Sequence, residues 1–385
     1  MAKTVHPRKV SGGTEEKLIR IVCALFFCAF TFLYLYFISA EVIAVAQHIL
    51  SGGMTHYNRI IGAVLTTAIL LVLQIFISGI THKGLMTYAL TFFPSMLILA
   101  MISCIVNHTI SGETIIPYAL AAVIALVIWA LIMLIASKVP VLEPSSTGFF
   151  SMPMWVNLLI MILMFIMVGI GTSGKDRDIY RARMEMNLMH GNYIEALETG
   201  IKSQTTDGHI TMLRMYALSK LGIAADYLFY YPIGGTSEDL VPKVNGSDML
   251  ILDQDSIYTH LGAIPREGMT TNSYLKAITK SGQATTAVGD YILCGLLIDR
   301  NLDGFAKELP NYYAINDSLP LHYREALTLY IHTSANTSLE YNDSLMNDYF
   351  LNMLRMEAQY ESREQAAQPI YEQYKGTYWY YYNYQ

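Results

Sequence analysis

Charged residues are scarce in this sequence. Only 15% of its 385 residues are Asp, Glu, Lys or Arg, whereas 53% are hydrophobic, and the mean hydropathy is +0.33. The charges are also unevenly spread, because residues 1–173 carry 8 basic and 5 acidic side chains and residues 174–385 carry 17 basic and 26 acidic ones. Nucleic-acid binding depends on Lys and Arg that neutralise phosphates. The acidic second half therefore argues against nucleic acid as a partner.

Cysteine is scarce too, and it follows no ligand pattern. The four cysteines are Cys23, Cys28, Cys104 and Cys294, and no two of them form a CxxC pair, so neither a zinc site nor a redox motif is predicted. The sequence also lacks HExxH and GxSxG motifs and acidic clusters with metal-ligand spacing. We therefore predict no catalytic, cofactor-binding or metal-binding residue and no cofactor, and we expect no enzymatic activity.

One glycine-rich stretch nearly fits a phosphate-binding loop. Gly169–Asp176 reads GIGTSGKD, but the motif requires Ser or Thr where Asp176 stands. The stretch also follows an apolar helical run instead of a strand, which is the wrong context for this loop. We interpret it as a flexible exit from the last apolar run.

A second stretch resembles the beginning of a calcium-binding loop. In Asp299–Pro310, DRNLDGFAKELP, oxygen-bearing residues fill the first, third and fifth positions, and Gly304 fills the sixth. The twelfth position, which needs a bidentate Glu, is Pro310. We therefore predict no calcium site and expect Asn301 or Asp303 to cap the short helix that follows.

Long apolar runs without charge dominate residues 1–173. A helix of about 20 residues crosses the hydrocarbon core of a membrane, and five runs approach this length: residues 21–40, 60–80, 85–106, 115–136 and 154–171. A soluble amphipathic helix would show a polar stripe, but these runs contain no charged residue. We predict that residues 1–173 form a multi-pass transmembrane domain that contacts membrane lipid.

Basic residues indicate the orientation of this domain, because Lys and Arg favour the cytoplasmic side. Five of them precede the first run: Lys3, Arg8, Lys9, Lys17 and Arg20. They favour a cytoplasmic N-terminus, and five crossings then place residues 174–385 outside. A second basic group follows the last run and favours the opposite orientation: Lys175, Arg177, Arg181 and Arg183. Long domains, however, are translocated largely regardless of their charge.

Few polar side chains lie in or near the apolar runs: Glu41, Gln74, Asn107, His108 and Asn157. An ionisable group inside a membrane is a candidate functional residue. Glu41 falls where the first run should reach the membrane surface, so we interpret it as an interfacial carboxylate. No Arg-rich helix and no clear inverted repeat accompanies these residues, which gives a transporter little support.

Residues 174–385 consist of charged, amphipathic segments and form a predicted soluble helical domain. Within residues 178–202 one helix is expected to end near Met189 and the next to begin at Tyr193. Several residues fall where a tetratricopeptide repeat (TPR) places its turn glycine and its packing residues: Leu188, Gly191, Tyr193, Ala196 and Gly222. Gly222 follows Gly191 by 31 residues, close to the TPR period of about 34.

Further segments of the same domain show helical periodicity, and strand signals are almost absent. These segments are residues 272–280, 287–299, 321–332, 344–359 and 363–374. His322 and His332 lie on different faces of one of them, so we predict no shared metal ion. Stacked helix pairs form an α-solenoid, and an isolated helix pair is the alternative. We predict an all-α protein with a transmembrane bundle followed by a TPR-like α-solenoid.

The last residues, YKGTYWYYYNYQ, are unusually aromatic. The aromatic residues of this tail are Tyr378, Trp379, Tyr380, Tyr381, Tyr382 and Tyr384. An end helix of a solenoid exposes an apolar face that needs a cap, and Tyr and Trp can bury a ring while keeping a polar group for hydrogen bonding. We expect the tail to cover the last helices as a lid. The alternative is an aromatic belt at the membrane–water boundary.

Three stretches carry a resemblance to a known family: residues 295–313 (GLLIDRNLDGFAKELPNYY), residues 319–330 (LPLHYREALTLY) and the aromatic tail. They resemble uncharacterised multi-pass inner-membrane proteins of Bacteroidota that have a C-terminal TPR-like helical domain. The resemblance covers the C-terminal domain best, and the apolar runs match only in kind. It implies a cell with two membranes, so that residues 174–385 would lie in the periplasm, and it implies no activity.

The leading functional hypothesis is a membrane-anchored scaffold whose TPR-like domain binds a protein or peptide, since solenoids present concave binding surfaces. An alternative is a component of lipid-linked glycan synthesis or transfer. That chemistry would need an acidic residue near the membrane, and Glu113 and Glu143 are the candidates in the loops between the runs. A third hypothesis is a small-molecule transporter.

Overall fold

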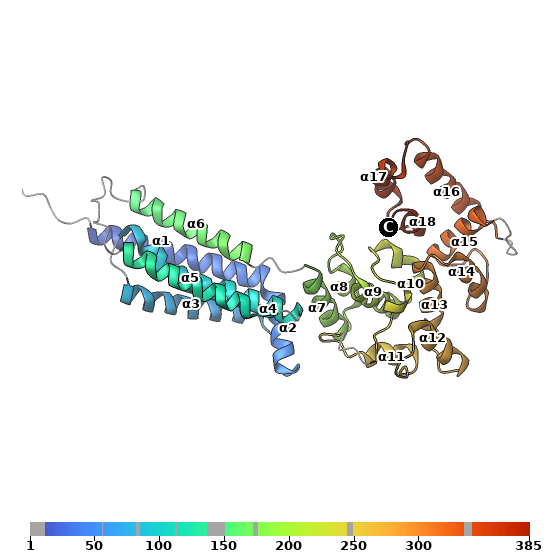
Figure 1. Cartoon of the computed structure of the whole chain (residues 1–385), viewed down its shortest axis with the longest axis horizontal. Helices are drawn as coiled ribbons and strands as arrows, with labels where there is room; N and C mark the ends of the chain where they lie inside the picture. The colour runs from blue at the N-terminus through green and yellow to red at the C-terminus, as the bar shows by residue number, and fades with distance from the viewer. Residues whose placement is uncertain are drawn as a thin grey trace, which may run out of the picture. The chain divides into compact units, whose positions relative to one another are not determined.

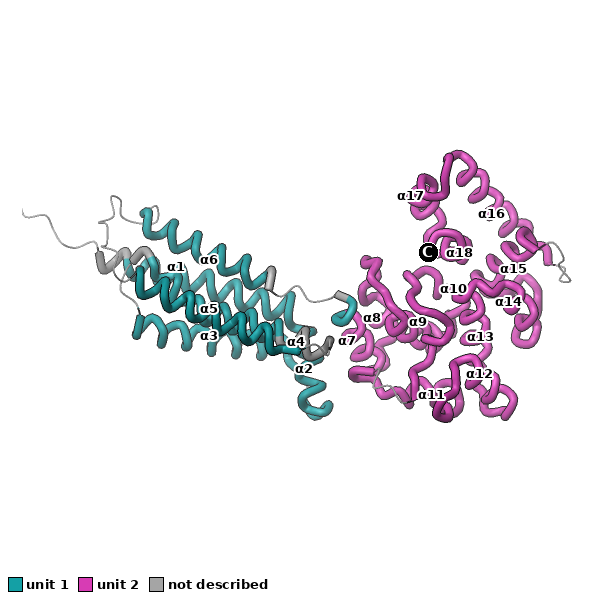
Figure 2. Tube along the Cα trace, viewed as in Figure 1, with its two compact units in different colours: residues 1–179 teal, residues 180–385 magenta. Residues whose placement is uncertain are grey.

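The computed structural model describes residues 12–55, 57–81, 85–111, 114–136, 151–171, 176–244, 249–334 and 341–385. These residues form helices and loops, and none of them lies in a β-strand. The predicted all-α fold is therefore confirmed. The chain divides into two compact units, residues 1–179 and residues 180–385 (Figure 1, Figure 2).

The described part of unit 1 contains five helical segments long and apolar enough to cross a membrane, as expected of a membrane protein. The α-helices of these segments are α1 (Gly12–Leu33), α3 (Arg59–Thr81), α4 (Phe93–Ser111), α5 (Ile116–Ala136) and α6 (Met152–Gly171). Each overlaps one predicted run. Helices that face lipid are expected to have exposed apolar side chains. Helix α5 shows this most clearly, because no residue of its membrane-length apolar segment is buried within the protein.

Two parts of unit 1 differ from a simple set of five straight helices. The first span continues from α1 through a π-helical turn, η1 (Tyr34–Ile38), and then leads into a short helix that the sequence did not predict, α2 (Ala40–Ser51). Its 12 residues extend only about 18 Å, too short to cross the membrane. The third span begins as a 3₁₀-helix, η2 (Leu85–Phe92), before it becomes α4.

Buried polar side chains join the helices of unit 1. The Asn157 side-chain oxygen in α6 accepts a hydrogen bond from the backbone N–H of Ala89 in η2 at 2.6 Å. Gln74 in α3 donates to the Thr91 hydroxyl at 3.0 Å and to the Tyr88 hydroxyl at 3.2 Å. Polar groups in hydrocarbon must find such internal partners. Helix packing therefore accounts for Gln74 and Asn157 without a transported substrate.

Residues 176–385 contain one further set of α-helices. They are α7 (Asp176–Met189), α8 (Tyr193–Glu198), α9 (Gly208–Leu221), α10 (Ala224–Tyr227), α11 (Asp255–Leu261), α12 (Thr271–Lys280), α13 (Ala287–Ile298), α14 (Leu302–Glu308), α15 (Leu321–Thr333), α16 (Ser344–Glu357), α17 (Arg363–Tyr374) and α18 (Tyr378–Tyr384). Short 3₁₀-helices connect some of them: η3 (Leu228–Tyr230), η4 (Ser237–Asp239) and η5 (Leu309–Asn311).

The consecutive helices predicted for the first part of unit 2 are present as α7, α8, α9 and α10. Gly191 adopts a positive φ of 76° between α7 and α8, and Gly222 adopts 72° at the end of α9, a conformation that L-residues with side chains avoid. Leu188 and Ala196 are buried, and Tyr193 packs against the core. The second helix of each pair is short, with six residues in α8 and four in α10. In length these pairs therefore differ from a regular TPR.

One continuous hydrophobic core runs through unit 2. It extends from Met184 in α7 to Tyr381 in α18, and Tyr323 in α15 is among its fully buried side chains. The last helix is thus part of the same core as the first helices of the unit. The burial of aromatic rings contributes most to such a core, because each ring removes a large apolar area from water.

Candidate functional site

The aromatic tail forms helix α18 and is packed inside unit 2. Tyr378 and Trp379 are 0% exposed, and Tyr381 is 6% exposed. The other three tyrosines are half-buried against the same core: Tyr380, Tyr382 and Tyr384. Rings of this kind at a membrane boundary would instead be exposed to the headgroups. The geometry of the tail is therefore that of the lid, not of the belt.

The buried carboxylate of Glu325 bonds to the first residue of α18. The Glu325 Oε2 atom accepts a hydrogen bond from the backbone N–H of Tyr378 at 2.7 Å and lies 2.9 Å from the His322 Nδ1 atom. The backbone N–H of Phe229 donates to His322 Nε2 at 3.3 Å. Since a backbone N–H can only donate, Nε2 carries no proton and Nδ1–H donates to Glu325. The Glu325 carboxyl group therefore accepts two hydrogen bonds at the N-terminal end of α18, where the helix dipole favours an acceptor.

Trp379 completes this contact. Its indole N–H donates to the backbone oxygen of Glu325 at 2.7 Å. Its ring lies 5.1 Å from the ring of Phe350 and 5.6 Å from that of Tyr349, both in α16. Such ring pairs add stability beyond the area that they bury. Helices α15, α16 and α18 are therefore joined at one residue.

Arg300 holds the other end of α18. Its guanidinium donates to the backbone oxygens of Tyr382 at 3.2 Å, of Tyr381 at 3.5 Å and of Gln385. The last carbonyls of a helix lack intrahelical partners, although the Tyr381 oxygen also accepts the Gln385 N–H at 3.3 Å. Among the described residues other than glycine, Arg300 alone has a positive φ, of 55°, a conformation that costs about 1–2 kcal/mol. The contacts with α18 offset this strain.

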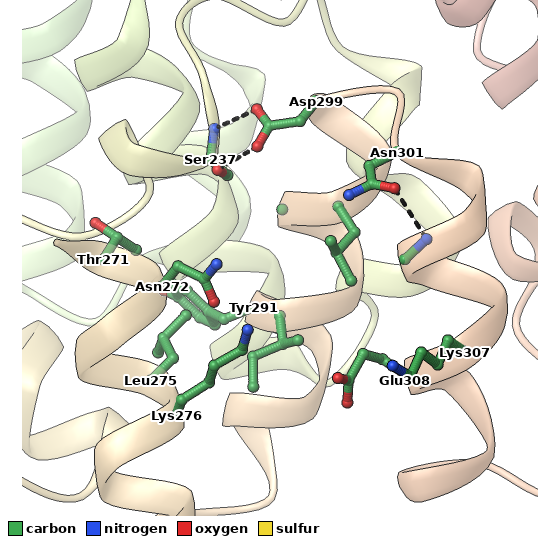
Figure 3. Close-up of a pocket in the computed structure, with 14 residues that line it drawn as sticks. Ser237, Thr271, Asn272, Leu275, Lys276, Tyr291, Asp299, Asn301, Lys307 and Glu308 are labelled. Carbon is green, nitrogen blue, oxygen red and sulfur yellow. Dashed lines mark hydrogen bonds between the residues drawn. The ribbon is translucent and has the colours of Figure 1, made fainter.

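A cavity of about 200 Å³ opens between α12, α13 and α14 (Figure 3). It is lined by Ser237, Thr271, Asn272, Leu275, Lys276, Tyr291, Ile292, Gly295, Leu296, Asp299, Asn301, Gly304, Lys307 and Glu308. Asp299 is held at its edge, because the Ser237 N–H donates to one carboxylate oxygen at 3.0 Å and the Ser237 hydroxyl donates to the other at 2.5 Å. Gly295 lies close by, since a Cβ there would stand 3.2 Å from the Ser237 Cβ.

The cavity carries cations whose hydrogen-bonding capacity is unused. Lys276 comes from α12 and Lys307 from α14, and Figure 3 shows them on opposite sides of the cavity. Both are exposed, and within the described part of the chain neither forms an ion pair or hydrogen bond. Glu308 differs, because it accepts a bond from the Asn311 amide at 2.9 Å. An ammonium group without a partner can donate to a ligand.

A second cavity, of about 460 Å³, adjoins the first. Thr271 lines both, and the consecutive residues Ser237 and Glu238 line one each. The Glu238 carboxylate accepts the backbone N–H of Thr271 at 2.6 Å, and the Glu238 backbone oxygen accepts the Thr271 hydroxyl at 2.8 Å. Most of the other lining residues belong to loops: Val241, Pro242, Lys243, Val244, Pro265, Glu267, Gly268, Met269, Thr270 and Tyr274. The two cavities therefore share one wall at the start of α12.

Cys294 lies in the core beside a buried carboxylate. Asp290 accepts hydrogen bonds from the hydroxyls of Tyr313 at 2.7 Å and Tyr323 at 2.8 Å. Burial raises the pKa of Asp290, and these two bonds partly oppose the rise. Burial also raises the pKa of the Cys294 thiol. A nucleophilic cysteine needs the thiolate form, so this thiol is a packing group.

The structure explains the sequence stretches that match known motifs only in part. As predicted, Asn301 caps α14, and its side-chain oxygen accepts the Gly304 N–H at 2.9 Å. His332 bonds to Asn347 at 2.6 Å and is separate from the contacts of His322. Among the described residues no three His, Cys, Asp or Glu side chains come together as a metal site.

Some predicted candidates lie outside the described residues. They are Glu113 and Glu143, Lys175, and the central part of the glycine-rich stretch at residues 172–175. The side chains of Glu41, Asn107 and His108 lie outside them as well. The glycan-transfer hypothesis depended on the first two glutamates, so it stays a prediction without a structural observation behind it.

His260 makes the stability of unit 2 dependent on pH. Its Nε2 atom lies 2.8 Å from the Ser219 hydroxyl, and its ring meets the Tyr216 ring edge-on. Burial, and secondarily Lys220, lower the pKa of His260 to about 4 from an ordinary 6.5. The unfolded chain then binds more protons between these values, so this contribution is complete above pH 6.5 and is lost as the pH falls through 4.

We therefore expect the midpoint of thermal unfolding of unit 2 to fall when the pH is lowered from 7 to 5. His260→Gln keeps a polar group beside Ser219 and removes the titration. The variant should show a smaller fall than the parent chain over the same range. Equal falls in the parent and His260→Gln would contradict the lowered pKa.

Comparison with known proteins adds one match. Residues 267–385 match the model of a family of unknown function, DUF6057. This segment contains α12 to α18, so it includes the bound tail helix and, apart from Ser237, the lining of the first cavity. No curated protein and no solved structure matches the chain. The match agrees with the resemblance to an uncharacterised family and implies no activity.

Proposed function

We propose that this protein is a membrane-anchored scaffold whose helical unit binds a protein or peptide partner without catalysis. The observation that carries the proposal is the pair of adjoining cavities beside α12, which together leave about 660 Å³ open at the surface of unit 2. Ligand sites are concave, mostly apolar and provided with a few polar groups, and these cavities have that composition. The apolar helices of unit 1 provide the anchor.

We further propose that unit 2 is a TPR-like stack of helix pairs. The order of short helices α7 to α10, with a glycine at the turn after α7 and at the end of α9, and the packing of α9 against both α8 and α10 support this arrangement. Stacks of this kind leave grooves between neighbouring pairs, where partner chains dock. The cleft between α12, α13 and α14 lies between helices of the same stack.

The proposed location is the inner membrane, with unit 2 in the periplasm. Five membrane-length helices and the basic N-terminal residues support it, as does the resemblance to envelope proteins of Bacteroidota. The location can be tested with Glu361→Cys, at an exposed position, and a thiol reagent that does not cross membranes. Labelling of spheroplasts from outside is expected, and labelling only after lysis would place unit 2 in the cytoplasm.

Binding can be tested by photo-crosslinking in cells. A photoreactive residue at Asn272, an exposed residue at the mouth of the first cavity, should give a crosslinked band of constant mass. The same residue at Lys280, exposed on α12 but outside both cavities, is the matched control and should give none. Repeated crosslinking from Asn272 without any specific protein product would overturn the proposed function.

A further inference from the structure

The two cavities lie next to each other at the first turn of α12, and we call this pair the cleft. Thr271 belongs to both, and its two bonds to Glu238 hold it in the wall between them. An extended peptide rises about 3.3 Å per residue, and its residues i and i+2 point to the same side. A chain that passes over Thr271 can therefore place two of its side chains, two residues apart, in the two cavities.

The smaller cavity offers hydrogen-bond donors that have no protein acceptor. It is lined by two lysines and two acidic residues, so its formal charges cancel. Both acids, Asp299 and Glu308, already accept hydrogen bonds within the protein, whereas the exposed Lys276 and Lys307 have no partner among the described residues (Figure 3). A carboxylate side chain can accept from these ammonium groups in place of water, and the volume of about 200 Å³ suits one side chain.

The larger cavity favours an apolar side chain. Val241, Pro242, Pro265 and Met269 contribute to its walls. The Tyr258 hydroxyl donates to the Pro242 backbone oxygen at 2.8 Å, which holds this wall in place. Proline and methionine side chains offer few hydrogen-bonding groups. Covering them with another apolar side chain removes apolar area from water, which favours binding.

We infer that this cleft binds an extended segment of a protein partner that carries an Asp or Glu two residues from an apolar residue. The inference rests on the proposed function and specifies its ligand. A carboxylate fits better than a phosphate, because Asp299 and Glu308 also line the smaller cavity and a phosphate carries nearly two charges at neutral pH. Two separate cavities also suit a chain with alternating side chains better than one compact small molecule.

The test is a selection of random heptapeptides displayed on phage against the full chain in lipid nanodiscs. The expected result is enrichment of sequences with an acidic residue two positions from Leu, Ile, Val, Phe or Met. Synthetic versions of an enriched peptide should lose about tenfold or more in affinity when Glu is replaced by Gln. They should lose as much when the protein carries both Lys276→Gln and Lys307→Gln.

Lys280→Gln removes a charge from α12 outside both cavities and should leave the affinity unchanged. The lysines are exposed, so these variants should fold like the parent chain. Enriched peptides without an acidic residue, or binding that survives the double lysine change, would overturn this inference while leaving the proposed function in place. No enrichment over empty nanodiscs would overturn both.

Discussion

Replacing Trp379 by alanine should lower the free energy of unfolding of the helical unit by about 3–5 kcal/mol, the range for removal of a buried aromatic side chain. Trp379 is fully buried, contacts the rings of Tyr349 and Phe350, and donates its indole N–H to Glu325. The change leaves a cavity at the junction of α15, α16 and α18 and leaves the Glu325 carbonyl without this donor. Both effects destabilise the folded state and leave the unfolded chain almost unaffected.

Hydrogen exchange of the full chain measures this effect, because the amides of α15 and α18 report opening of the unit. Trp379→Phe keeps most of the ring and loses the N–H, so its loss should lie between zero and that of the alanine variant. Tyr227→Ala removes an aromatic side chain that is 51% exposed and serves as the control. If Trp379→Ala exchanged no faster than Tyr227→Ala, α18 would not be part of the core.

Replacing Glu325 by leucine should release α18 and lower the stability of unit 2 by about 3 kcal/mol, because two buried N–H donors lose their acceptor. The Glu325 Oε2 atom accepts from both His322 and Tyr378. Leucine has a similar size and no acceptor, whereas the single oxygen of glutamine could replace Oε2 for both donors. His322 cannot adapt by exchanging its proton between ring nitrogens, since its Nε2 atom accepts from Phe229.

Fluorescence of Trp379 follows this release directly. The chain has three tryptophans, so a background with Trp129→Phe and Trp155→Phe leaves Trp379 as the sole emitter. Glu325→Leu in this background should shift the emission to the red and lower the urea midpoint. Glu361→Leu changes an exposed carboxylate and should do neither. Unshifted emission from Glu325→Leu would mean that other contacts hold the tail.

Local patterns were sufficient to predict most helices of the fold. The apolar runs and the amphipathic periods match α3, α5, α6 and α7 closely, because helix formation depends on neighbours three and four residues apart. The 3₁₀ geometry of η2 was not predictable in this way. It accompanies a bond from Ala89 to Asn157, which lie 68 residues apart in the chain. The bend at Ser39 likewise includes a contact with the distant Ser103.

The candidate cleft was harder to predict from the sequence than the burial of the aromatic tail. The aromatic residues of the tail predicted burial, but nothing local identified Glu325, 53 residues away, as their partner. Lys276 and Lys307 are ordinary surface lysines in their own helices, and only the packing of α12 against α13 and α14 brings them to one cavity. The DRNLDG stretch is the sequence feature that comes closest to identifying this cavity. It resembles the beginning of a calcium-binding loop, but in the structure its Asp299 lies at the cavity edge and its Asn301 caps α14.

The place of α18 in the core has a consequence for the order of synthesis. Ribosomes make α10, α13 and α15 before α18, although Tyr378 and Tyr381 bond to Leu297, Ile298 and Glu325 in those earlier helices or at their ends. Until residues 378–384 emerge, the apolar surface that they cover has no intramolecular partner. Such surface is the kind that chaperones bind. The unit should therefore depend on a holding factor during its production, most of all if it crosses a membrane before it folds.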